Sequence, residues 1–274
     1  MKKDHKVFVA DIDRTLRDGS PDIGPLTRSA MNELHRRGVL MGIASGRPLW
    51  QRLLTHAQEW GLDFQFDFLI GLNGGEILDT RKNEKKLLNP LDEETIRDII
   101  LKMEHTGTNP FVYRDEGYML ALRMDALLEA SAKRNKNEAR VVKDISELWA
   151  EPTGKIMYRT ETQKEMDEEV IPYARTLENN HIFCFKTAVN LLEFQDRKNN
   201  KGNALIEYCK DNGIDMEDVI AFGDAENDLE MMRAAGYSVC LCNGMKENKE
   251  IADAVSEYPA GDDGVGHWLY DHYL

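Results

Sequence analysis

The chain has 274 residues, 42% of them hydrophobic and 31% charged, which is typical of a folded protein with one large or two smaller domains. Its formal net charge of −14 argues against nucleic acid or an anionic membrane as the main partner, because phosphate backbones are bound by net basic surfaces. No apolar run approaches the ~20 residues that span a bilayer, and no signal peptide is evident, so we expect a cytoplasmic protein.

The N-terminal part alternates short apolar runs with helical periods, which predicts βαβ units and a parallel sheet. We expect strands at residues 6–13, 39–44 and 66–72, and helices at residues 27–37 and 48–60. A glycine directly follows each expected helix, as is common at helix C-termini.

The pattern changes after the charged segment 81–86, which we interpret as a linker. The residues that follow mix strands and helices with antiparallel-like spacing, which indicates an inserted α+β unit. Its helices are expected at residues 92–105, 124–133 and 164–179, and its strands at residues 111–114, 118–122, 155–159, 181–186 and 190–194.

The first pattern returns near residue 200, with a helix expected at residues 201–210 and a strand at 218–222. We therefore predict a doubly wound parallel-sheet α/β domain made of residues 1–82 and 190–274. Residues 83–189 would form the inserted α+β domain.

Polar groups lie at the ends of four of the expected strands, and a lysine opens the helix near residue 201. These residues are Asp11 and Asp13, Ser45, Gly46 and Arg47, Asn73, and Asp224, Asn227 and Asp228, with Lys201 at the helix start. Because a parallel sheet presents its strand ends at one edge, these groups can converge there. Taken singly, the aspartates suit turns or helix caps and the lysine suits a solvated surface, so only the whole set together indicates a functional site.

This combination of side chains suits phosphoryl transfer. A phosphate ester resists an anionic nucleophile, and a Mg²⁺ ion held by carboxylate or carbonyl oxygens lowers that repulsion. One carboxylate can then attack phosphorus, and a second carboxyl group can give a proton to the leaving oxygen. A hydroxyl, backbone N–H groups and a lysine ammonium can hold the remaining phosphate oxygens.

Five segments in chain order resemble the motifs of the haloacid dehalogenase (HAD) superfamily, in its Cof-type branch with a type-IIB cap. They are Asp11-Ile12-Asp13-Arg14-Thr15-Leu16, Ala44-Ser45-Gly46-Arg47-Pro48, Asn73-Gly74-Gly75, Asn200-Lys201-Gly202-Asn203-Ala204-Leu205 and Gly223-Asp224-Ala225-Glu226-Asn227-Asp228. The resemblance covers the chain from about residue 6 to the C-terminus and is weakest in the inserted unit. It implies a Rossmann-like core with a cap domain that closes over the substrate.

The resemblance also assigns roles residue by residue. Asp11 would be the nucleophile and a Mg²⁺ ligand, and Asp13 the general acid and base with its backbone carbonyl on the metal. Lys201 would neutralise the phosphoryl charge and fix Asp11. The other assigned residues are Asp224 and Asp228 at the metal, and Ser45, Gly46, Arg47, Asn73 and Asn227 at the phosphate or substrate.

Arg14 departs from the family pattern, which usually has glycine after the second aspartate. Its guanidinium either adds a phosphate or substrate contact, or points away and has no catalytic role. Segments 81–86 and 186–190 would be the hinges of the cap. The candidate specificity residues in the cap are Arg114, Arg123, Arg134 and Lys186.

The sequence therefore predicts a Mg²⁺-dependent phosphatase that hydrolyses a small phosphomonoester, such as a sugar phosphate or a phosphorylated cofactor, through an aspartyl-phosphate intermediate. A phosphomutase of the same superfamily and a non-catalytic sensor of a phosphate ligand are the alternatives. The expected partner is a small-molecule phosphate ester, and no feature of the sequence indicates an oligomeric state.

Overall fold

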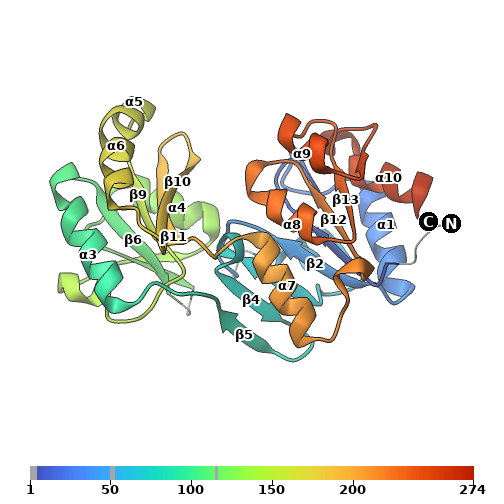
Figure 1. Cartoon of the computed structure of the whole chain (residues 1–274), viewed down its shortest axis with the longest axis horizontal. Helices are drawn as coiled ribbons and strands as arrows, with labels where there is room; N and C mark the ends of the chain where they lie inside the picture. The colour runs from blue at the N-terminus through green and yellow to red at the C-terminus, as the bar shows by residue number, and fades with distance from the viewer. Residues whose placement is uncertain (1–4, 50–52, 115–116) are drawn as a thin grey trace. The chain divides into compact units, whose positions relative to one another are not determined.

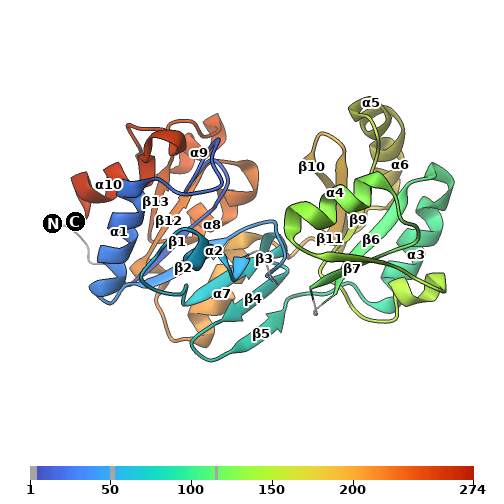
Figure 2. The same cartoon turned by 180° about the vertical axis from the view of Figure 1, so that it is seen from behind.

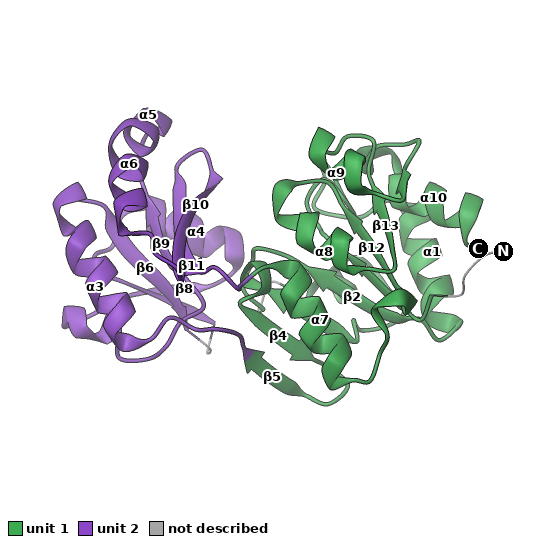
Figure 3. Ribbon diagram, in the orientation of Figure 1, with its two compact units in different colours: residues 1–49, 53–86, 200–274 green, residues 50–52, 87–199 purple. Residues whose placement is uncertain are grey.

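The computed structural model describes residues 5–49, 53–114 and 117–274 (Figure 1). These residues form two compact units, which are coloured separately in Figure 3. Unit 1 contains residues 5–49, 53–86 and 200–274, and unit 2 contains residues 87–114 and 117–199. No helix among the described residues is both long enough and apolar enough to cross a membrane.

Unit 1 is built on a sheet whose described strands lie in the order β14-β13-β12-β1-β2-β3-β4-β5. The strands are β1 (Val7–Ala10), β2 (Leu40–Ala44), β3 (Phe68–Gly71), β4 (Glu76–Asp79), β5 (Glu84–Leu87), β12 (Val219–Gly223), β13 (Tyr237–Cys240) and β14 (Ala254–Val255). The pairs from β14 through β1 to β3 are parallel, and β4 runs antiparallel to β3. All four residues of β1 are apolar and buried, as expected of a central strand with both faces covered.

Helices pack against both faces of this sheet. They are α1 (Pro25–Arg36), α2 (His56–Glu59), α7 (Lys201–Asp211), α8 (Leu229–Ala234), α9 (Lys246–Ile251) and α10 (Gly264–His272). On one face, α1 and α10 lie side by side and share a core with Phe8 and Phe222 (Figure 2). On the other face, Tyr208 of α7 stacks on Phe68 of β3 with their ring centroids 4.0 Å apart. The predicted doubly wound α/β fold is confirmed.

Unit 2 is an α+β unit with the strand order β10-β11-β9-β6-β7-β8. Its strands are β6 (Asn109–Arg114), β7 (Tyr118–Ala121), β8 (Glu138–Val141), β9 (Ile156–Arg159), β10 (Ile182–Ala188) and β11 (Leu191–Asp196), and its helices are α3 (Glu93–Met103), α4 (Ala126–Asn135), α5 (Gln163–Glu165) and α6 (Ile171–Ala174). The described pairs are antiparallel apart from β7–β8. The predicted α+β character of this unit is confirmed.

The boundaries of the inserted unit differ from the predicted ones. β11 pairs with β9 and β10, so residues 190–199 belong to unit 2 rather than to unit 1. Segment 81–86 is not a simple linker, because it contains most of β5, a charged strand at the edge of the unit 1 sheet. Segment 186–190 is the end of β10 and the turn into β11. Strand partners distant in sequence decide these boundaries.

Two predicted helices also differ. Residues 164–179 do not form one α-helix, since a π-helical turn at Met166–Val170 separates α5 from α6. Pro172 contributes to the irregularity, because it has no N–H to donate to an earlier carbonyl. The helix expected at residues 48–60 includes residues 50–52, which lie outside the described residues, and the structure has α2 within the rest of that range.

The two ends of unit 2 are tied to each other where the chain passes between the units. Asn89 Nδ2 donates to Asn199 Oδ1 at 3.1 Å, and Asn199 Nδ2 donates to the Asn89 carbonyl at 3.3 Å. Gln195 Nε2 donates to the Asn199 carbonyl at 2.8 Å. The next residue, Asn200, caps α7 by accepting a hydrogen bond from the Asn203 N–H at 2.7 Å. Hydrogen bonds therefore hold residue 199 within unit 2 and residue 200 within unit 1.

Gly74, in the 3₁₀ turn Leu72–Gly74, has a φ of +97° and packs against Asn200. A Cβ there would lie 2.1 Å from the Asn200 carbonyl oxygen. We therefore expect Gly74→Ala to lower the free energy of unfolding by more than ~2 kcal/mol, measured by urea denaturation. Gly38→Ala is the matched control, since its φ is +84° but its Cβ would meet nothing within 4 Å. The control should lose only about 1 kcal/mol, and equal losses would contradict the packing argument.

Candidate active site

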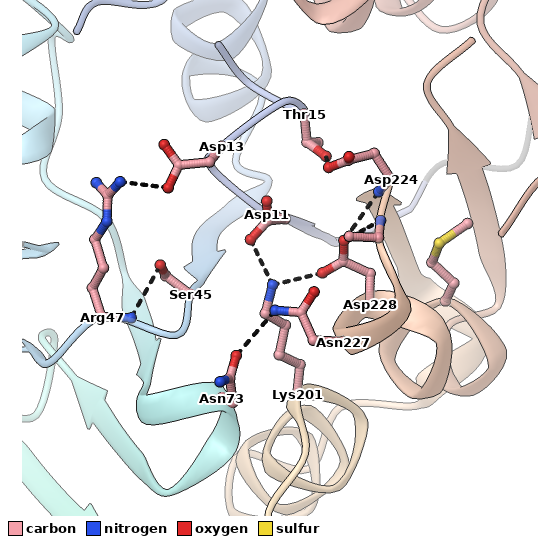
Figure 4. Close-up of polar contacts among 12 residues, drawn as sticks. Asp11, Asp13, Thr15, Ser45, Arg47, Asn73, Lys201, Asp224, Asn227 and Asp228 are labelled. Carbon is pink, nitrogen blue, oxygen red and sulfur yellow. Dashed lines mark hydrogen bonds and ion pairs between the residues drawn. The ribbon is translucent and has the colours of Figure 1, made fainter. Parts of the chain in front are cut away.

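The predicted polar residues lie where the parallel strands of unit 1 end (Figure 4). Asp11 directly follows β1, and Asp224 directly follows the neighbouring strand β12. The Asp11 N–H donates to the Phe222 carbonyl at 3.0 Å, which extends the pairing of the two strands up to the carboxylate. Adjacent parallel strands thus bring together two aspartates from opposite ends of the chain.

Lys201 reaches the same edge from the first turn of α7, and its side chain is fully buried. Its Nζ lies 2.5 Å from Asp11 Oδ1 and 2.6 Å from Asp228 Oδ1 (Figure 4). Gly202 allows α8 to approach this helix, because a Cβ there would lie 2.3 Å from the Glu230 carbonyl oxygen. Asp11, Lys201 and Asp228 thus form a buried ion triad.

Asp228 is held by backbone groups of its own loop as well as by the ammonium. Its Oδ2 accepts hydrogen bonds from the N–H groups of Asp224 and Ala225, each at 3.0 Å. Gly223 leaves room for this arrangement, since a Cβ there would lie 2.6 Å from the Asp228 Cβ. The loop therefore orients one carboxylate oxygen toward Lys201 and satisfies the other.

Three buried carboxylates, those of Asp11, Asp224 and Asp228, form an acidic cluster that fits a divalent cation. Each offers one oxygen, and the three oxygens lie within 4.8 Å of one another. Thr15 Oγ1 donates to Asp224 Oδ1 at 2.9 Å, whereas Asp224 Oδ2 is buried and accepts no hydrogen bond from the described residues. Lys201 supplies one positive charge against three carboxylates, so negative charge is in excess. Hard oxygen ligands with excess negative charge suit Mg²⁺.

Burial and the excess of carboxylates change the pKa values in this cluster. Burial raises the pKa of Asp11 to about 7, although the Lys201 ammonium opposes the shift. Burial also raises the pKa of Asp224 to about 6, against the hydrogen bond from Thr15. For Lys201, burial acts to lower the pKa, but the neighbouring Asp11 and Asp228 carboxylates raise it above its usual value. Lys201 is therefore a permanent cation, whereas the carboxyl groups of Asp11 and Asp224 are costly to ionise in the absence of a further cation.

Asp13 lies outside the acidic cluster, and its side chain is 52% exposed. Its Oδ1 lies 3.0 Å from Arg17 Nη2, and its Oδ2 lies 2.5 Å from Arg47 Nη2. Two guanidinium groups therefore hold the two carboxylate oxygens separately. The metal contact of Asp13 through its backbone carbonyl stays a prediction.

The residues predicted to bind phosphate gather beside the ion triad (Figure 4). Ser45 is buried directly after β2, and the Arg47 N–H donates to Ser45 Oγ at 3.3 Å. The Asn73 N–H donates to the Ser45 carbonyl at 3.0 Å, and Asn227 Nδ2 donates to Asn73 Oδ1 at 3.0 Å. Gly46 lies against this amide, since a Cβ there would be 3.0 Å from Asn73 Oδ1. A hydroxyl and amide groups from three strand ends are thus close together, as binding of phosphate oxygens requires.

Arg14 makes contacts that neither sequence interpretation included. Its φ of +68° lies in the left-handed region that favours glycine. Its Nη2 donates to the Asn243 carbonyl at 2.9 Å, and Asn243 Nδ2 donates to the Arg14 carbonyl at 2.8 Å. Its Nε lies 3.8 Å from Asp224 Oδ2, the oxygen that accepts no hydrogen bond from the part of the chain that the structure describes. The guanidinium is therefore a cation next to the acidic cluster.

Arg17 also lies in this region, although the sequence pattern did not predict it there. Its side chain is only 7% exposed and binds Asp13. The one signal in the sequence is the spacing of opposite charges four residues apart, which predicts a contact in a helix. Here the contact arises in a tight loop instead, in which Asp13 and Arg17 form an isolated β-bridge.

Three of the four candidate specificity residues form hydrogen bonds or ion pairs with other residues of unit 2. Arg114 and Arg123 donate hydrogen bonds to main-chain carbonyls of that unit. Lys186 Nζ lies 2.5 Å from Asp167 Oδ1. Arg134 is exposed on α4. These contacts give the first three residues a structural role within the unit.

Asp224→Asn tests the electrostatic state of the acidic cluster. In the folded protein the pKa of Asp224 lies near 6 rather than 3.8, so its contribution to stability is present below pH 4 and is lost as the pH rises through 6. The variant removes that loss and keeps an oxygen for the Thr15 hydrogen bond. Without divalent cations we expect its melting temperature to exceed that of the wild type by roughly 2–5 °C at pH 8, and the difference to vanish near pH 4. A variant that is less stable at both pH values would contradict this account.

The matched family model, described as haloacid dehalogenase-like hydrolase, covers residues 8–269. An HMP-PP phosphatase from Cronobacter sakazakii is 30% identical over 237 residues, which cover 86% of this chain and 84% of that protein. A crystal structure from Thermotoga maritima is similar with a TM-score of 0.86 at 25% identity, covering 98% of both chains. A haloacid dehalogenase-like hydrolase from Bacteroides thetaiotaomicron shares the fold with a TM-score of 0.86 at 24% identity, covering 97% of this chain and 99% of that one. With its strand-end aspartates, buried lysine and matching family model, the chain belongs to the haloacid dehalogenase-like hydrolase family.

Proposed function

We propose that the protein is a Mg²⁺-dependent phosphatase that hydrolyses a small phosphomonoester, a sugar phosphate or a phosphorylated cofactor, through an aspartyl-phosphate on Asp11. The observation that carries the proposal is the ion triad next to Asp224, which combines a carboxylate nucleophile, a fixed cation and a set of metal ligands. Relatives named as HMP-PP phosphatases support a reaction at a phosphate ester.

Asp11, Asp224 and Asp228 would hold the metal through carboxylate oxygens, and Asp13 through its backbone carbonyl. A bound Mg²⁺ ion neutralises part of the phosphate charge that otherwise repels an anionic nucleophile. The buried Asp224 Oδ2 supports this assignment, because it accepts no hydrogen bond from the described residues and a buried oxygen normally accepts one.

In the first step of the proposed reaction, an Asp11 oxygen forms a bond to phosphorus while the bond to the ester oxygen breaks. The carboxyl group of Asp13 gives its proton to that oxygen, which leaves as an alcohol. In the second step, water adds to phosphorus while the bond to Asp11 breaks, and the proton of the water returns to Asp13. The sum is hydrolysis of the ester to an alcohol and inorganic phosphate.

Lys201 would hold Asp11 in place and stabilise the charge on the phosphoryl oxygens during both steps. The Ser45 hydroxyl and the Asn73 amide would bind the same oxygens, with Gly46 and Asn227 shaping their surroundings. Unit 2 would serve as the cap that selects the substrate and excludes water.

Asp11→Asn tests the nucleophile. We expect release of inorganic phosphate from a metabolite panel to fall by at least ~10³-fold, because an amide oxygen cannot form the aspartyl-phosphate. Acid-quenched wild type should yield a phosphorylated peptide containing Asp11 by mass spectrometry, and the variant should not. Asp18→Asn, which changes an exposed carboxylate in the same loop, is the control and should keep wild-type activity. A chelator should abolish release, and added Mg²⁺ should restore it.

Other outcomes of the same assay would contradict the proposal. Full activity in Asp11→Asn would exclude the nucleophile assignment, and activity unaffected by chelation would exclude the metal. Formation of a hexose bisphosphate from two sugar phosphates would indicate a phosphomutase. A ligand-dependent thermal shift with Mg²⁺ but no phosphate release would indicate a sensor.

Arg14→Gly tests the cation beside the acidic cluster. The Arg14 guanidinium lies 3.8 Å from Asp224 Oδ2, and its positive charge opposes the binding of Mg²⁺ at that oxygen. Because the side chain is half exposed, we expect its removal to strengthen Mg²⁺ binding by about 1 kcal/mol, or ~5-fold in Kd. Isothermal titration calorimetry with Mg²⁺ alone measures this directly. Arg14→Lys keeps the charge and is the control, and equal Kd values for the two variants would overturn the interpretation.

A further inference from the structure

We propose that Arg17 is a positioning residue that holds the Asp13 carboxyl group in the orientation needed for proton transfer to the leaving oxygen. The inference rests on the proposed function, in which Asp13 is the general acid and base. It concerns a side chain that does not itself touch the substrate.

The Arg17 guanidinium binds Asp13 on one side and the main chain on the other. Its Nη2 lies 3.0 Å from Asp13 Oδ1, and its Nη1 donates to the Pro21 carbonyl at 2.7 Å and to the Ser20 carbonyl at 3.3 Å. The side chain is almost fully buried, whereas Asp13 is half exposed. A rigid, buried group thus holds one that faces solvent.

The acceptor of this guanidinium is itself fixed to the hydrophobic core of unit 1. Trp60 Nε1 donates to the Pro21 carbonyl at 3.1 Å, so this carbonyl links the indole to Arg17. The Trp60 side chain is buried and meets Phe66 edge to face. A continuous path of hydrogen bonds therefore runs from the core through Pro21 and Arg17 to Asp13.

The backbone of Arg17 closes the loop that carries Asp11 and Asp13. The Arg14 N–H donates to the Arg17 carbonyl at 2.7 Å, and the Arg17 N–H donates to the Ile12 carbonyl at 3.2 Å. These two hydrogen bonds therefore fix the backbone of Arg17 relative to Asp13. Arg47 binds the other carboxylate oxygen from a different strand end, and the two guanidinium groups together oppose rotation of the carboxylate.

Loss of this orientation should affect only steps in which Asp13 moves a proton to the leaving group. General-acid catalysis requires the acid within hydrogen-bond reach of the leaving oxygen, and it matters most when that oxygen would otherwise leave as a strong base. A phenolate with an electron-withdrawing nitro group leaves readily without a proton. A purely structural defect would lower the hydrolysis of good and poor leaving groups alike.

The test compares kcat/KM of wild type and Arg17→Lys for phenyl phosphates whose ring substituents vary the basicity of the leaving phenolate. This parameter reports the steps up to release of the phenol, so the second step does not interfere. We expect kcat/KM to fall roughly tenfold or more for unsubstituted phenyl phosphate and about twofold or less for 4-nitrophenyl phosphate. Asp13→Asn should also lower kcat/KM more for phenyl phosphate than for 4-nitrophenyl phosphate, and by a larger factor than Arg17→Lys.

Arg28→Lys is the matched control, because Arg28 pairs with Asp22 at 2.9 Å next to the same segment. It should keep the wild-type dependence on the leaving group. If Arg17→Lys does not fold by circular dichroism, Trp60→Phe carries the test, since it removes the hydrogen bond to Pro21 and keeps an aromatic ring. Trp60→Phe should also lower kcat/KM more for the poor leaving groups than for the good ones, but by a smaller factor than Arg17→Lys.

The possible outcomes separate the inference from the proposed function. Equal losses across the phenyl phosphate series would overturn the positioning role while leaving the phosphatase in place. No phosphate release by the wild type with Mg²⁺ on any ester would overturn the proposed function and the inference with it. A loss confined to poor leaving groups supports both.

Discussion

The structure of unit 1 depends on one buried interaction, the ammonium of Lys201 between the carboxylates of Asp11 and Asp228. Desolvating three charges is unfavourable, and only close contacts and further hydrogen bonds offset it. Several features of the fold meet that requirement. α7 must begin at the lysine, Gly202 must let α8 approach, and the loop before Asp228 must supply backbone N–H groups. Loss of one member would leave an unpaired buried charge, so the triad constrains the surrounding backbone.

The acidic cluster works against stability in the protein alone. Burial raises the pKa values of Asp11 and Asp224, which means that their ionised forms are unfavourable where they lie. These groups lower the stability of the protein alone, and under the proposed function a bound cation would offset that loss. The Arg14 guanidinium, next to Asp224, offsets part of the repulsion among the three carboxylates. Its backbone, however, adopts a left-handed conformation that favours glycine.

The sequence predicted the parts of this structure that follow from local pattern. Strand and helix periods identified the doubly wound core, and the strand-end rule brought Asp11 and Asp224 together because their strands are adjacent and parallel. The local sequence pattern gave wrong assignments where pairing with a strand distant in sequence determines the structure. The charged strand β5 looked like a linker, and β11 was assigned to the wrong unit because its partners β9 and β10 cannot be read locally. Arg17 was missed because its acceptors are carbonyls placed by the course of a loop.

The amide pair between Asn89 and Asn199 has a consequence for how this molecule could change over evolution. It brings the entry and exit of unit 2 together, so the whole insertion is grafted onto unit 1 through neighbouring ends, as tolerated domain insertions are. Beyond the exit, Asn200 and the Gly74 turn anchor the chain before Lys201. Recombination could therefore exchange the insertion for another of different sequence, and, with unit 2 as the proposed substrate-selecting cap, such an exchange would change selectivity while leaving the residues of the acidic cluster in place.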